Sequence, residues 1–301
     1  MADQKQALAV LTNPVAGRGR FADVVPAVLD RLAASGRPIR VLDASTREEA
    51  QAACHAAVAD GAGALVAVGG DGTMHLALQA VAGTGVAFGA VPAGTGNDFA
   101  VATGVPVEPL DAAAAVADAV QAGRTRPIDL ARVTGPGGAA MWYGSVLAAG
   151  FDAVVNERAN RMRWPRGPRR YDLAIFVELL RLKARRYVVR LDGDEQRIDA
   201  VLLAVGNCAS YGGGIRICPA ADPTDGLLDV VLGNVDRATL VRLKPKTYEG
   251  THVEHPQVHS YRARTVEIAA EGITTYVDGE RALPLPVTIT AVPGAIRLLA
   301  P

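Results

Sequence analysis

The first 130 residues alternate short apolar runs with helical patterns, and this alternation constrains the fold more than any other feature of the chain. Each apolar run is too short for a helix and is typical of a buried strand. Strands that are joined through helices predict a parallel sheet with helices on both faces. We expect strands at 8–12, 39–42, 64–68 and 87–91, and helices at 21–34, 46–61, 73–81 and 111–121.

Helix-end signals support these boundaries. Thr46 is followed three residues later by Glu49, which is the spacing of a capping box. Asp111 lies at the start of the last helical pattern, and Gly123 lies just past its end, where glycine commonly terminates a helix.

The pattern changes after about residue 132, where strand-like runs separated by turn signals predict a β-sandwich. We therefore expect an α/β domain at 1–131 and an all-β domain at 132–292, with residues 293–301 packing back onto the first domain and a cleft between the two domains. The second domain offers one long helical candidate, at 170–185. Its predicted strands are 141–148, 187–191, 198–205, 227–232, 265–269, 274–277 and 287–292.

Three glycine-rich turns follow predicted strands of the first domain, at 13–19, 69–73 and 92–98. In a parallel sheet, ligands bind outside the carboxyl ends of the strands. Glycines there let the backbone approach a phosphate group, and the following helix N-terminus adds partial positive charge. Any one such turn is explained as a tight connection, but three together predict a nucleotide site.

Polar residues in these turns indicate phosphoryl transfer. Asp71, Asn97 and Asp98 offer oxygen ligands that suit Mg²⁺. Thr73 and Thr95 offer hydroxyl groups to phosphate oxygens. No G-x-x-x-x-G-K-[ST] motif occurs, and no turn has the third glycine of a dinucleotide-binding motif, so the chain is neither a Walker-type ATPase nor an ordinary Rossmann dehydrogenase.

These turns, together with motifs of the second half, resemble the diacylglycerol and sphingosine kinase superfamily over nearly the whole chain, and most of all its bacterial soluble diacylglycerol kinases. The first-domain motifs are Asn13-Pro14 with Gly17, Gly-Gly-Asp-Gly-Thr at 69–73 and Pro-x-Gly-Thr-Gly-Asn-Asp at 92–98. The second-domain motifs are Gly150-Phe-Asp152, Asn207 with Gly212-Gly-Gly214, Pro219 with Asp225-Gly226-Leu227, Tyr248-x-Gly250-x-His252 and Asp278-Gly279-Glu280.

The resemblance implies an ATP-dependent lipid kinase that converts diacylglycerol to phosphatidic acid, with ATP and Mg²⁺ as cofactors. It implies an active site in the cleft between the two domains and assigns Asp71 and Asp98 to catalysis with Mg²⁺. It also implies a structural Mg²⁺ held by Asp222, Asp225 and Leu227; because position 222 is acidic here, Asp222 can bind through its carbonyl or its carboxylate. The implied ATP-binding residues are Asn13, Pro14, Gly17, Thr46, Gly69, Gly70, Asp71, Gly72, Thr73, Gly94, Thr95, Gly96 and Asn97.

Asp278 and Glu280 supply the family's catalytic carboxylate. They lie two residues apart at the end of a predicted strand, so both side chains can lie on one face. One can accept the proton of the lipid hydroxyl while the other helps to fix the metal or the geometry. The competing interpretation is a plain Asp-Gly hairpin turn, like Asp192-Gly193, and which carboxylate is the base stays open.

Charge is distributed unevenly, although the whole chain has 31 basic and 31 acidic residues. Residues 158–190 contain eleven basic and two acidic residues, which leaves 20 basic and 29 acidic residues elsewhere. The segment from Arg158 to Arg170 also contains Trp164, an aromatic residue typical of membrane interfaces. We expect this segment to contact an anionic membrane surface; a solvated face and nucleic-acid binding are the alternatives, and the acidic remainder disfavours nucleic acid.

The remaining signals bound the cellular setting. Three cysteines, no apolar signal region and no stretch of about 20 apolar residues predict a cytoplasmic protein. The basic segment adds the expectation of transient contact with the inner face of the membrane. We expect a structural role for His252, His255 and His259, in place of a metal site, and His75 either tunes the nucleotide pocket or is structural. A homodimer is usual in such relatives.

Other functions stay open at this point. The acceptor can be a sphingoid base, a monoacylglycerol or a polyprenol. NAD kinase shares the Gly-Gly-Asp-Gly motif, but the turn at 92–98 favours lipid kinases. A non-catalytic nucleotide-binding regulator is disfavoured because Asp71, Asp98, Asp278 and Glu280 are all present.

Overall fold

Two units make up the chain in the computed structural model, which describes residues 7–12, 22–162, 164 and 168–300. Unit 1 comprises Met1–Leu130, Pro223–Asp225 and Val292–Pro301, and unit 2 comprises Ala131–Asp222 and Gly226–Ala291.

Unit 1 is built on a parallel sheet, as the alternating pattern predicted. β1 (Leu8–Thr12) pairs in parallel with β2 (Ile39–Leu42) on one side and with β3 (Ala64–Gly69) on the other. β3 pairs in parallel with β4 (Ala87–Pro92), and β4 pairs with the last residues of β16 (Val287–Leu299). The C-terminal residues of the chain therefore complete the sheet of unit 1.

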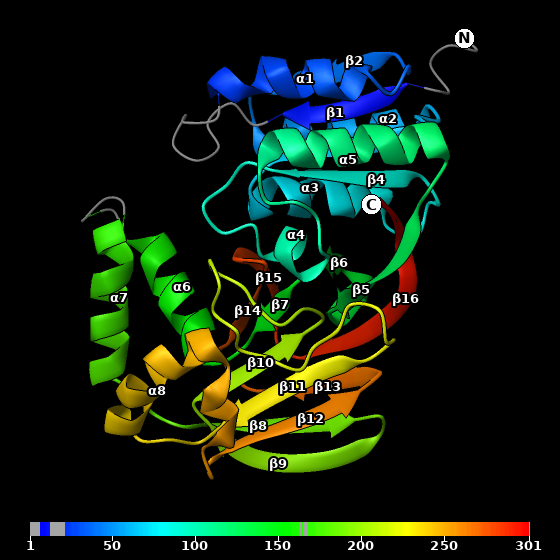
Figure 1. Cartoon of the computed structure of the whole chain (residues 1–301). Helices are drawn as coiled ribbons and strands as arrows, with labels where there is room; N and C mark the ends of the chain where they lie inside the picture. The colour runs from blue at the N-terminus through cyan, green and yellow to red at the C-terminus, as the bar shows by residue number, and fades with distance from the viewer. Residues whose placement is uncertain (1–6, 13–21, 163, 165–167, 301) are drawn as a thin grey trace. The chain divides into compact units, whose positions relative to one another are not determined.

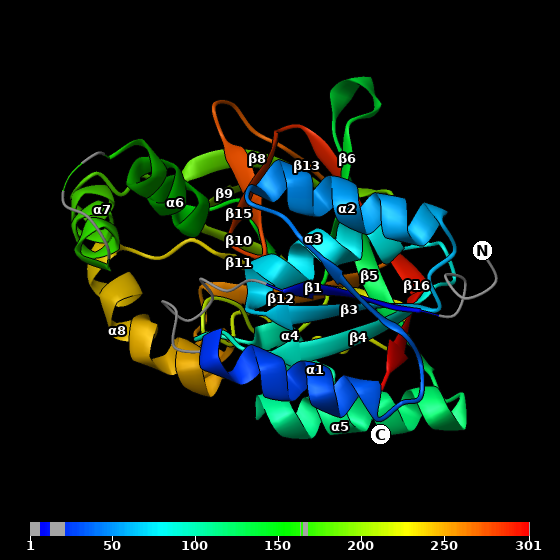
Figure 2. The same cartoon turned by 90° about the horizontal axis from the view of Figure 1, so that it is seen from above.

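Helices cover both faces of this sheet (Figure 2). α1 (Val25–Ala33), which follows a 3-10 turn at Ala22–Val24, packs beside α5 (Pro109–Ala122) on one face. On the other face, α2 (Arg47–Ala59) packs beside α3 (Asp71–Val81). The predicted capping box is present, because the Thr46 hydroxyl accepts a hydrogen bond from Glu49 N, and the Glu49 carboxylate accepts one from Thr46 N.

Unit 2 is built from antiparallel strands in two sheets, which confirms the predicted β-sandwich. One sheet has the order β12-β11-β10-β7-β14-β15, and the other contains β16-β13-β8-β9, with β5 and β6 paired beside it (Figure 1). The strands are β5 (Arg126–Thr134), β6 (Ala140–Tyr143), β7 (Val146–Ala148), β8 (Arg185–Leu191), β9 (Asp194–Ala200), β10 (Leu202–Gly206), β11 (Leu228–Gly233), β12 (Val258–Ala263), β13 (Thr265–Ala269), β14 (Thr274–Val277) and β15 (Glu280–Pro284).

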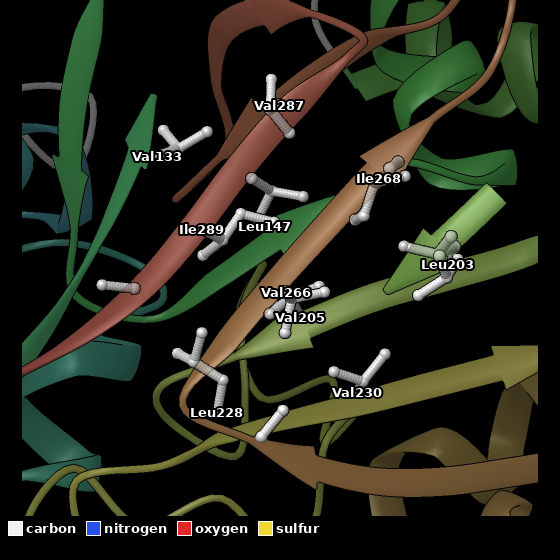
Figure 3. Packing of buried hydrophobic residues seen from close by; sticks show 14 of the residues in the cluster. Val133, Leu147, Leu203, Val205, Leu228, Val230, Val266, Ile268, Val287 and Ile289 are labelled. Carbon is white, nitrogen blue, oxygen red and sulfur yellow. The ribbon is translucent and has the colours of Figure 1, made fainter. Parts of the chain in front are cut away.

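Branched aliphatic side chains from both sheets fill the core of unit 2 (Figure 3). Such side chains suit a pleated surface that is buried on one face. The labelled members of this cluster are Val133, Leu147, Leu203, Val205, Leu228, Val230, Val266, Ile268, Val287 and Ile289.

The sequence predicted one of the three helices that the described chain has in unit 2, and it missed the other two. α6 (Phe151–Arg161) buries only Ala153, Val155 and Ala159, so its helical pattern is weak among the surrounding arginines. α8 (Arg237–Glu249) buries only Leu243 and contains a proline. α7 (Pro168–Leu180) ends at Leu180, five residues earlier than predicted.

Two predicted strands are each divided in the structure. The run 141–148 breaks after Tyr143, where Gly144 and Ser145 turn their N–H groups toward the Asp278 carboxylate. The run 198–205 breaks at Val201, because β9 and β10 belong to different sheets. An apolar run in the sequence indicates that the residues are buried, but it does not indicate where the chain leaves one sheet and enters the other.

Candidate active site

The turn between β3 and α3 depends on glycine. A Cβ atom at Gly69 would overlap the Thr73 side chain, so the threonine can pack on the turn only because Gly69 has no side chain. Gly70 is the N-cap of α3, and Asp71 is the first residue of this helix of 11 residues. The N-terminus of such a helix favours negative charge, which makes the turn suitable for a phosphate group.

The turn between β4 and α4 (Asp98–Ala102) is closed by the side chain of Asn97. Asn97 has a left-handed backbone conformation with φ of 60°. Its Oδ1 accepts a hydrogen bond from Gly94 N at 3.0 Å, and its Nδ2 donates one to Gly94 O at 3.3 Å. The structure therefore gives Asn97 a role in shaping the turn that the sequence did not reveal. Asp98 follows at the start of α4 and is buried.

These two turns lie together in unit 1. Ala93 N donates a hydrogen bond to Gly69 O at 2.8 Å. A Cβ atom at Gly94 would lie 2.5 Å from Gly70 Cα, so the backbones touch at two glycines. Phe99 N donates a long hydrogen bond of 3.5 Å to the Asp71 carboxylate. The turn at 13–19, with Asn13, Pro14 and Gly17, lies outside the described residues.

Thr46 and His75 have structural contacts in unit 1. The Thr46 hydroxyl oxygen caps α2, as described above. His75 is on α3 and only 1% exposed, and its ring lies 3.5 Å from the Gln79 side-chain amide. The burial of His75 suits a packing role at least as well as a contact with a nucleotide.

Asp278 and Gly279 form the two-residue turn of the β14–β15 hairpin. Both have positive φ, 51° and 83°, which is the conformation of a type I′ turn and suits an Asp-Gly pair. Val277 and Glu280 face each other as the last strand pair before this turn. The plain hairpin turn weighed from the sequence is therefore present, and the question becomes what surrounds it.

Two backbone N–H groups hold the Asp278 carboxylate. Gly144 N donates to Oδ2 at 3.0 Å, and Ser145 N donates to Oδ1 at 2.8 Å. Hydrogen bonds to an ionised acceptor are stronger than those between neutral groups. The carboxylate also helps to raise the pKa of Tyr143, whose complete burial is the larger cause. The Asp278 carboxylate is thus fixed in orientation beside a buried tyrosine.

A cleft of about 1620 Å³ lies in unit 2 between α6 and the strands that follow α7. Apolar side chains form part of its wall, among them Phe151, Val154, Met162, Leu182 and Ile273. Its basic lining residues are Arg158, Arg161, Arg181, Lys183, Arg185 and Arg186. Ligand pockets for drug-sized molecules are about 300–1,000 Å³, so this cleft has room for a larger and partly apolar ligand.

Large apolar residues are exposed both within the basic segment and on α7, which begins at the end of that segment. Trp164 is 79% exposed, and Phe176 and Leu180 are 58% and 54% exposed. Arg158 forms an ion pair with Glu178 of α7, and Arg161 forms one with Glu157 of its own helix. Two of the arginines expected at a membrane therefore also have partners within the protein. Arg163 and Arg166 lie outside the described residues.

No three His, Cys, Asp or Glu side chains come together as a metal site in the described part of the chain. The histidines at 252 and 259 have different surroundings. His252 is buried and its Nε2 lies 3.1 Å from Ile217 O, whereas His259 is exposed on β12. The ion sites expected from the sequence would not form such a cluster. One would combine Asp71 and Asp98 with Asn97, and the other would combine the Asp225 carboxylate with oxygens of Asp222 and Leu227.

The fold and these features define a class: a kinase of the NAD kinase and diacylglycerol kinase fold, with glycine turns in a parallel-sheet domain and a sandwich domain after it. Comparison with family models narrows this class. Residues 7–133 match the diacylglycerol kinase catalytic domain, and residues 145–300 match the YegS C-terminal NAD kinase beta sandwich-like domain. The chain belongs to the diacylglycerol kinase family, and it is a lipid kinase.

Relatives with curated names agree with this membership. The diacylglycerol kinase of Mycobacterium tuberculosis (strain ATCC 25618 / H37Rv) is 44% identical over 97% of this chain and 94% of the relative. A protein of Pseudomonas aeruginosa (strain UCBPP-PA14) named "Probable lipid kinase YegS-like" is 31% identical over 99% of this chain and 95% of the relative.

Solved structures share the fold. A diacylglycerol kinase from Bacillus anthracis str. Sterne matches with a TM-score of 0.72 and 19% identity, over 99% of this chain and 97% of that one. An NAD kinase from Archaeoglobus fulgidus in complex with ATP matches with a TM-score of 0.53 and 15% identity, over 97% and 92% of the two chains. In the described part of this chain, none of the helices has the length and apolar character that crossing a bilayer requires.

Proposed function

We propose that this lipid kinase transfers the γ-phosphoryl group of ATP to the free hydroxyl of diacylglycerol and so forms phosphatidic acid. The observation that carries the proposal is the Asp278 carboxylate, held by two N–H groups in the same unit as a large, partly apolar cleft. The relatives named diacylglycerol kinase support this acceptor over other lipids.

The joined turns of unit 1 are suited to the phosphates of ATP. Gly70 and Gly94 let two backbone segments come close, and the N-terminus of α3 favours the negative charge of a phosphate. Phosphoryl transfer depends on positioning and on neutralising charge more than on covalent help. These turns would hold the β- and γ-phosphates in place.

Oxygen donors at these turns fit Mg²⁺, which prefers carboxylate and carbonyl ligands. Asp71 and Asp98 lie at the starts of α3 and α4, where the Asp71 carboxylate reaches Phe99 N. They would hold the ion with Asn97, and Asp222, Asp225 and Leu227 would hold a second, structural ion. When bound, Mg²⁺ supplies positive charge that offsets the charge of the phosphate oxygens.

The base of the reaction would be one of the two hairpin carboxylates. The lipid hydroxyl loses its proton to this carboxylate as its oxygen bonds to the γ-phosphorus, and the bond from that phosphorus to the ADP oxygen breaks. Asp278 is the better candidate, because the N–H groups of Gly144 and Ser145 fix its orientation before the substrate arrives. Glu280 would then assist with the metal or the geometry.

The membrane contact proposed for the segment from Arg158 to Arg170 gains apolar support from α7. Trp164, Phe176 and Leu180 are exposed beside a strongly basic stretch, which suits shallow insertion into an anionic surface. Because Arg161 pairs with Glu157, a test of docking should spare it and replace Arg169 and Arg170 instead.

Labelled ATP and a panel of acceptors test the function. Dioctanoylglycerol, a monoacylglycerol, sphingosine and NAD would each be incubated with the protein, and the labelled product would be identified. We expect phosphorylated dioctanoylglycerol as the main product. Main labelling of sphingosine or the monoacylglycerol would move the proposal to that lipid, and labelling of NAD alone would overturn the lipid assignment.

A further inference from the structure

Glu157 of α6 is hydrogen-bonded to both strands of the hairpin that carries Asp278 and Glu280. Its Oε2 accepts a hydrogen bond from the Tyr276 hydroxyl at 2.8 Å and another from Arg281 Nε at 3.0 Å. Tyr276 belongs to β14, and Arg281 belongs to β15. A single carboxylate on a helix thereby joins the two strands from outside the sheet.

The two residues that donate to Glu157, Tyr276 and Arg281, lie on either side of the proposed catalytic carboxylates in the sequence. Tyr276 lies two residues before Asp278, Arg281 lies directly after Glu280, and Tyr276 and Arg281 face each other in the strand register. Tyr276 is also held from α6 by Asn160, whose side-chain amide donates to the hydroxyl at 3.1 Å. The hydrogen bonds from α6 therefore hold the hairpin at the Tyr276–Arg281 pair, which is one strand pair away from the pair next to the turn.

The hairpin needs an anchor because its own strand pairing is limited. β15 is the edge strand of its sheet, with β14 as its one neighbour in the strand order. The register between β14 and β15 shifts between Thr274 and Tyr276, which interrupts the ladder. Such irregularities bend a strand and re-aim its side chains. A tether from α6 compensates for the missing neighbour on the outer edge.

Glu157 is suited to this task because it stays ionised. The hydrogen bond from Arg281 is the largest cause that lowers the pKa of Glu157, to about 2, and hydrogen bonds from Tyr276 and Arg161 add to it. Its side chain is 20% exposed, and Arg161 of its own helix donates two hydrogen bonds to Oε1. The carboxylate is thus held by cations on both sides.

We infer that Glu157 is a positioning residue, which fixes the hairpin so that its carboxylates keep the geometry that the transfer needs. This inference rests on the proposed catalytic roles of Asp278 and Glu280. Displacement of a catalytic group by about 1 Å can slow a reaction by about a hundredfold. Glu157 also lines the cleft of unit 2, but its proposed role is to position the hairpin through its contacts with Tyr276 and Arg281.

Replacement of Glu157 by glutamine tests the inference, because the shape is kept and the charge is lost. We expect kcat to fall roughly ten- to hundredfold, with the KM for ATP unchanged, since the nucleotide turns lie in unit 1. Tyr276→Phe, which removes one donor, should cause a smaller loss. In a double-mutant cycle, Glu157→Gln and Arg281→Gln should be far from additive because the two residues act as one contact.

Glu195→Gln is the matched control. Glu195 also accepts a hydrogen bond from an arginine across a hairpin, Arg190 at 2.7 Å, but in the β8–β9 hairpin. Its replacement should leave kcat unchanged. Equal losses in the two variants would overturn the inference, because a general effect of removing a carboxylate would then explain both.

Amide hydrogen exchange supplies a readout that does not depend on activity. Peptides covering residues 275–283 should exchange faster in Glu157→Gln, with little change elsewhere in unit 2. Faster exchange with unchanged kcat would reduce Glu157 to a structural contact and overturn the positioning role. If Asp278→Asn and Glu280→Gln both keep full activity, the proposed catalytic carboxylates fail instead, and that outcome is separate from the exchange result.

Discussion

Two hairpins of unit 2 have nearly the same turn, yet only one of them is a candidate for catalysis. Asp192-Gly193 joins β8 to β9 with φ of 49° and 102°, and Asp278-Gly279 joins β14 to β15 with φ of 51° and 83°. Each aspartate accepts hydrogen bonds from two successive backbone N–H groups. For Asp192 the donors are the N–H groups of Arg264 and Thr265. The distance from Thr265 N to the Asp192 carboxylate is 2.8 Å, the same as the distance from Ser145 N to the Asp278 carboxylate.

The difference lies in what surrounds each turn. Asp192 is exposed, and its neighbours Arg190, Glu195 and Glu267 form an exposed ion-pair group. Asp278 is partly buried, and Gly144, one of its donors, is fixed in turn by Asn207 Nδ2 and Cys208 Sγ, which donate to its carbonyl. The same local sequence thus makes a plain turn in one place and a supported carboxylate in the other.

The largest expected effect separates the two aspartates by activity. Asp278→Asn should lower kcat about 10²- to 10⁴-fold, which is the usual contribution of a general base, and Asp192→Asn should leave kcat within about a factor of two. Turnover of dioctanoylglycerol in detergent, with both variants shown to be folded, measures the difference. Full activity of Asp278→Asn would mean that the two turns are equivalent.

The residue that follows each turn gives the next test. Glu280 and Asp194 occupy corresponding places, as the first residues of β15 and β9. Glu280→Gln should reduce kcat roughly tenfold or more if it assists the metal or the geometry, and Asp194→Asn should have no effect. A larger loss in Glu280→Gln than in Asp278→Asn would make Glu280 the base.

The fold of unit 1 could be predicted from the sequence because its signals are local. The strand at 39–42 was predicted with its observed boundaries, and the Thr46 capping box and the Gly123 helix end are recorded in a few neighbouring residues. In unit 2, α6 and α8 were missed because few of their side chains are buried, and no local pattern records contacts made across the sheets.

The candidate site shows the same limit. The glycine turns and the Asp278-Gly279 pair are visible in the sequence, because glycine is required where two backbones touch or where φ is positive. The hydrogen bonds from Gly144 and Ser145 to Asp278 are not visible in the sequence, because the donors lie more than 130 residues away along the chain. The nearest signal was the glycine inside the predicted strand 141–148, which marks an interruption.

Stability should distinguish the two aspartates much less than activity does. Asp278→Ala removes the acceptor of two N–H groups in a partly buried site, at a cost of roughly 1–3 kcal/mol. Asp192→Ala should cost less, because its hydrogen bonds from the N–H groups of Arg264 and Thr265 are exposed, and these groups can bond to water instead. The melting temperature should therefore fall somewhat more in Asp278→Ala than in Asp192→Ala. A rise in melting temperature for Asp278→Ala alone would sharpen the comparison, because it would mean that this turn is held under strain for the sake of its function.

The smallest expected effect concerns Glu157 and Glu195, the glutamates that form ion pairs at the two hairpins. It is measured as the pH dependence of stability. The pKa of Glu157 is lowered to about 2, chiefly by Arg281, from an unfolded value of about 4.3. A carboxyl whose pKa is lowered on folding stabilises the folded state above its unfolded pKa, and this contribution disappears as the pH falls toward the folded pKa. Wild type should therefore melt above Glu157→Gln at pH 7, and the two should converge between about pH 4.5 and pH 2.

The pKa of Glu195 is also lowered, mainly by Arg190, so the sign is the same for the β8–β9 hairpin. Its ion pair lies at the surface, where such pairs contribute little because water and salt screen them. Glu195→Gln should therefore follow the wild-type melting curve closely from pH 7 to pH 2. If the melting temperature of Glu195→Gln differs from wild type as much as that of Glu157→Gln does, the Glu157–Arg281 ion pair contributes no more than an ordinary surface pair. The two hairpins would then differ only in the surroundings of their aspartates.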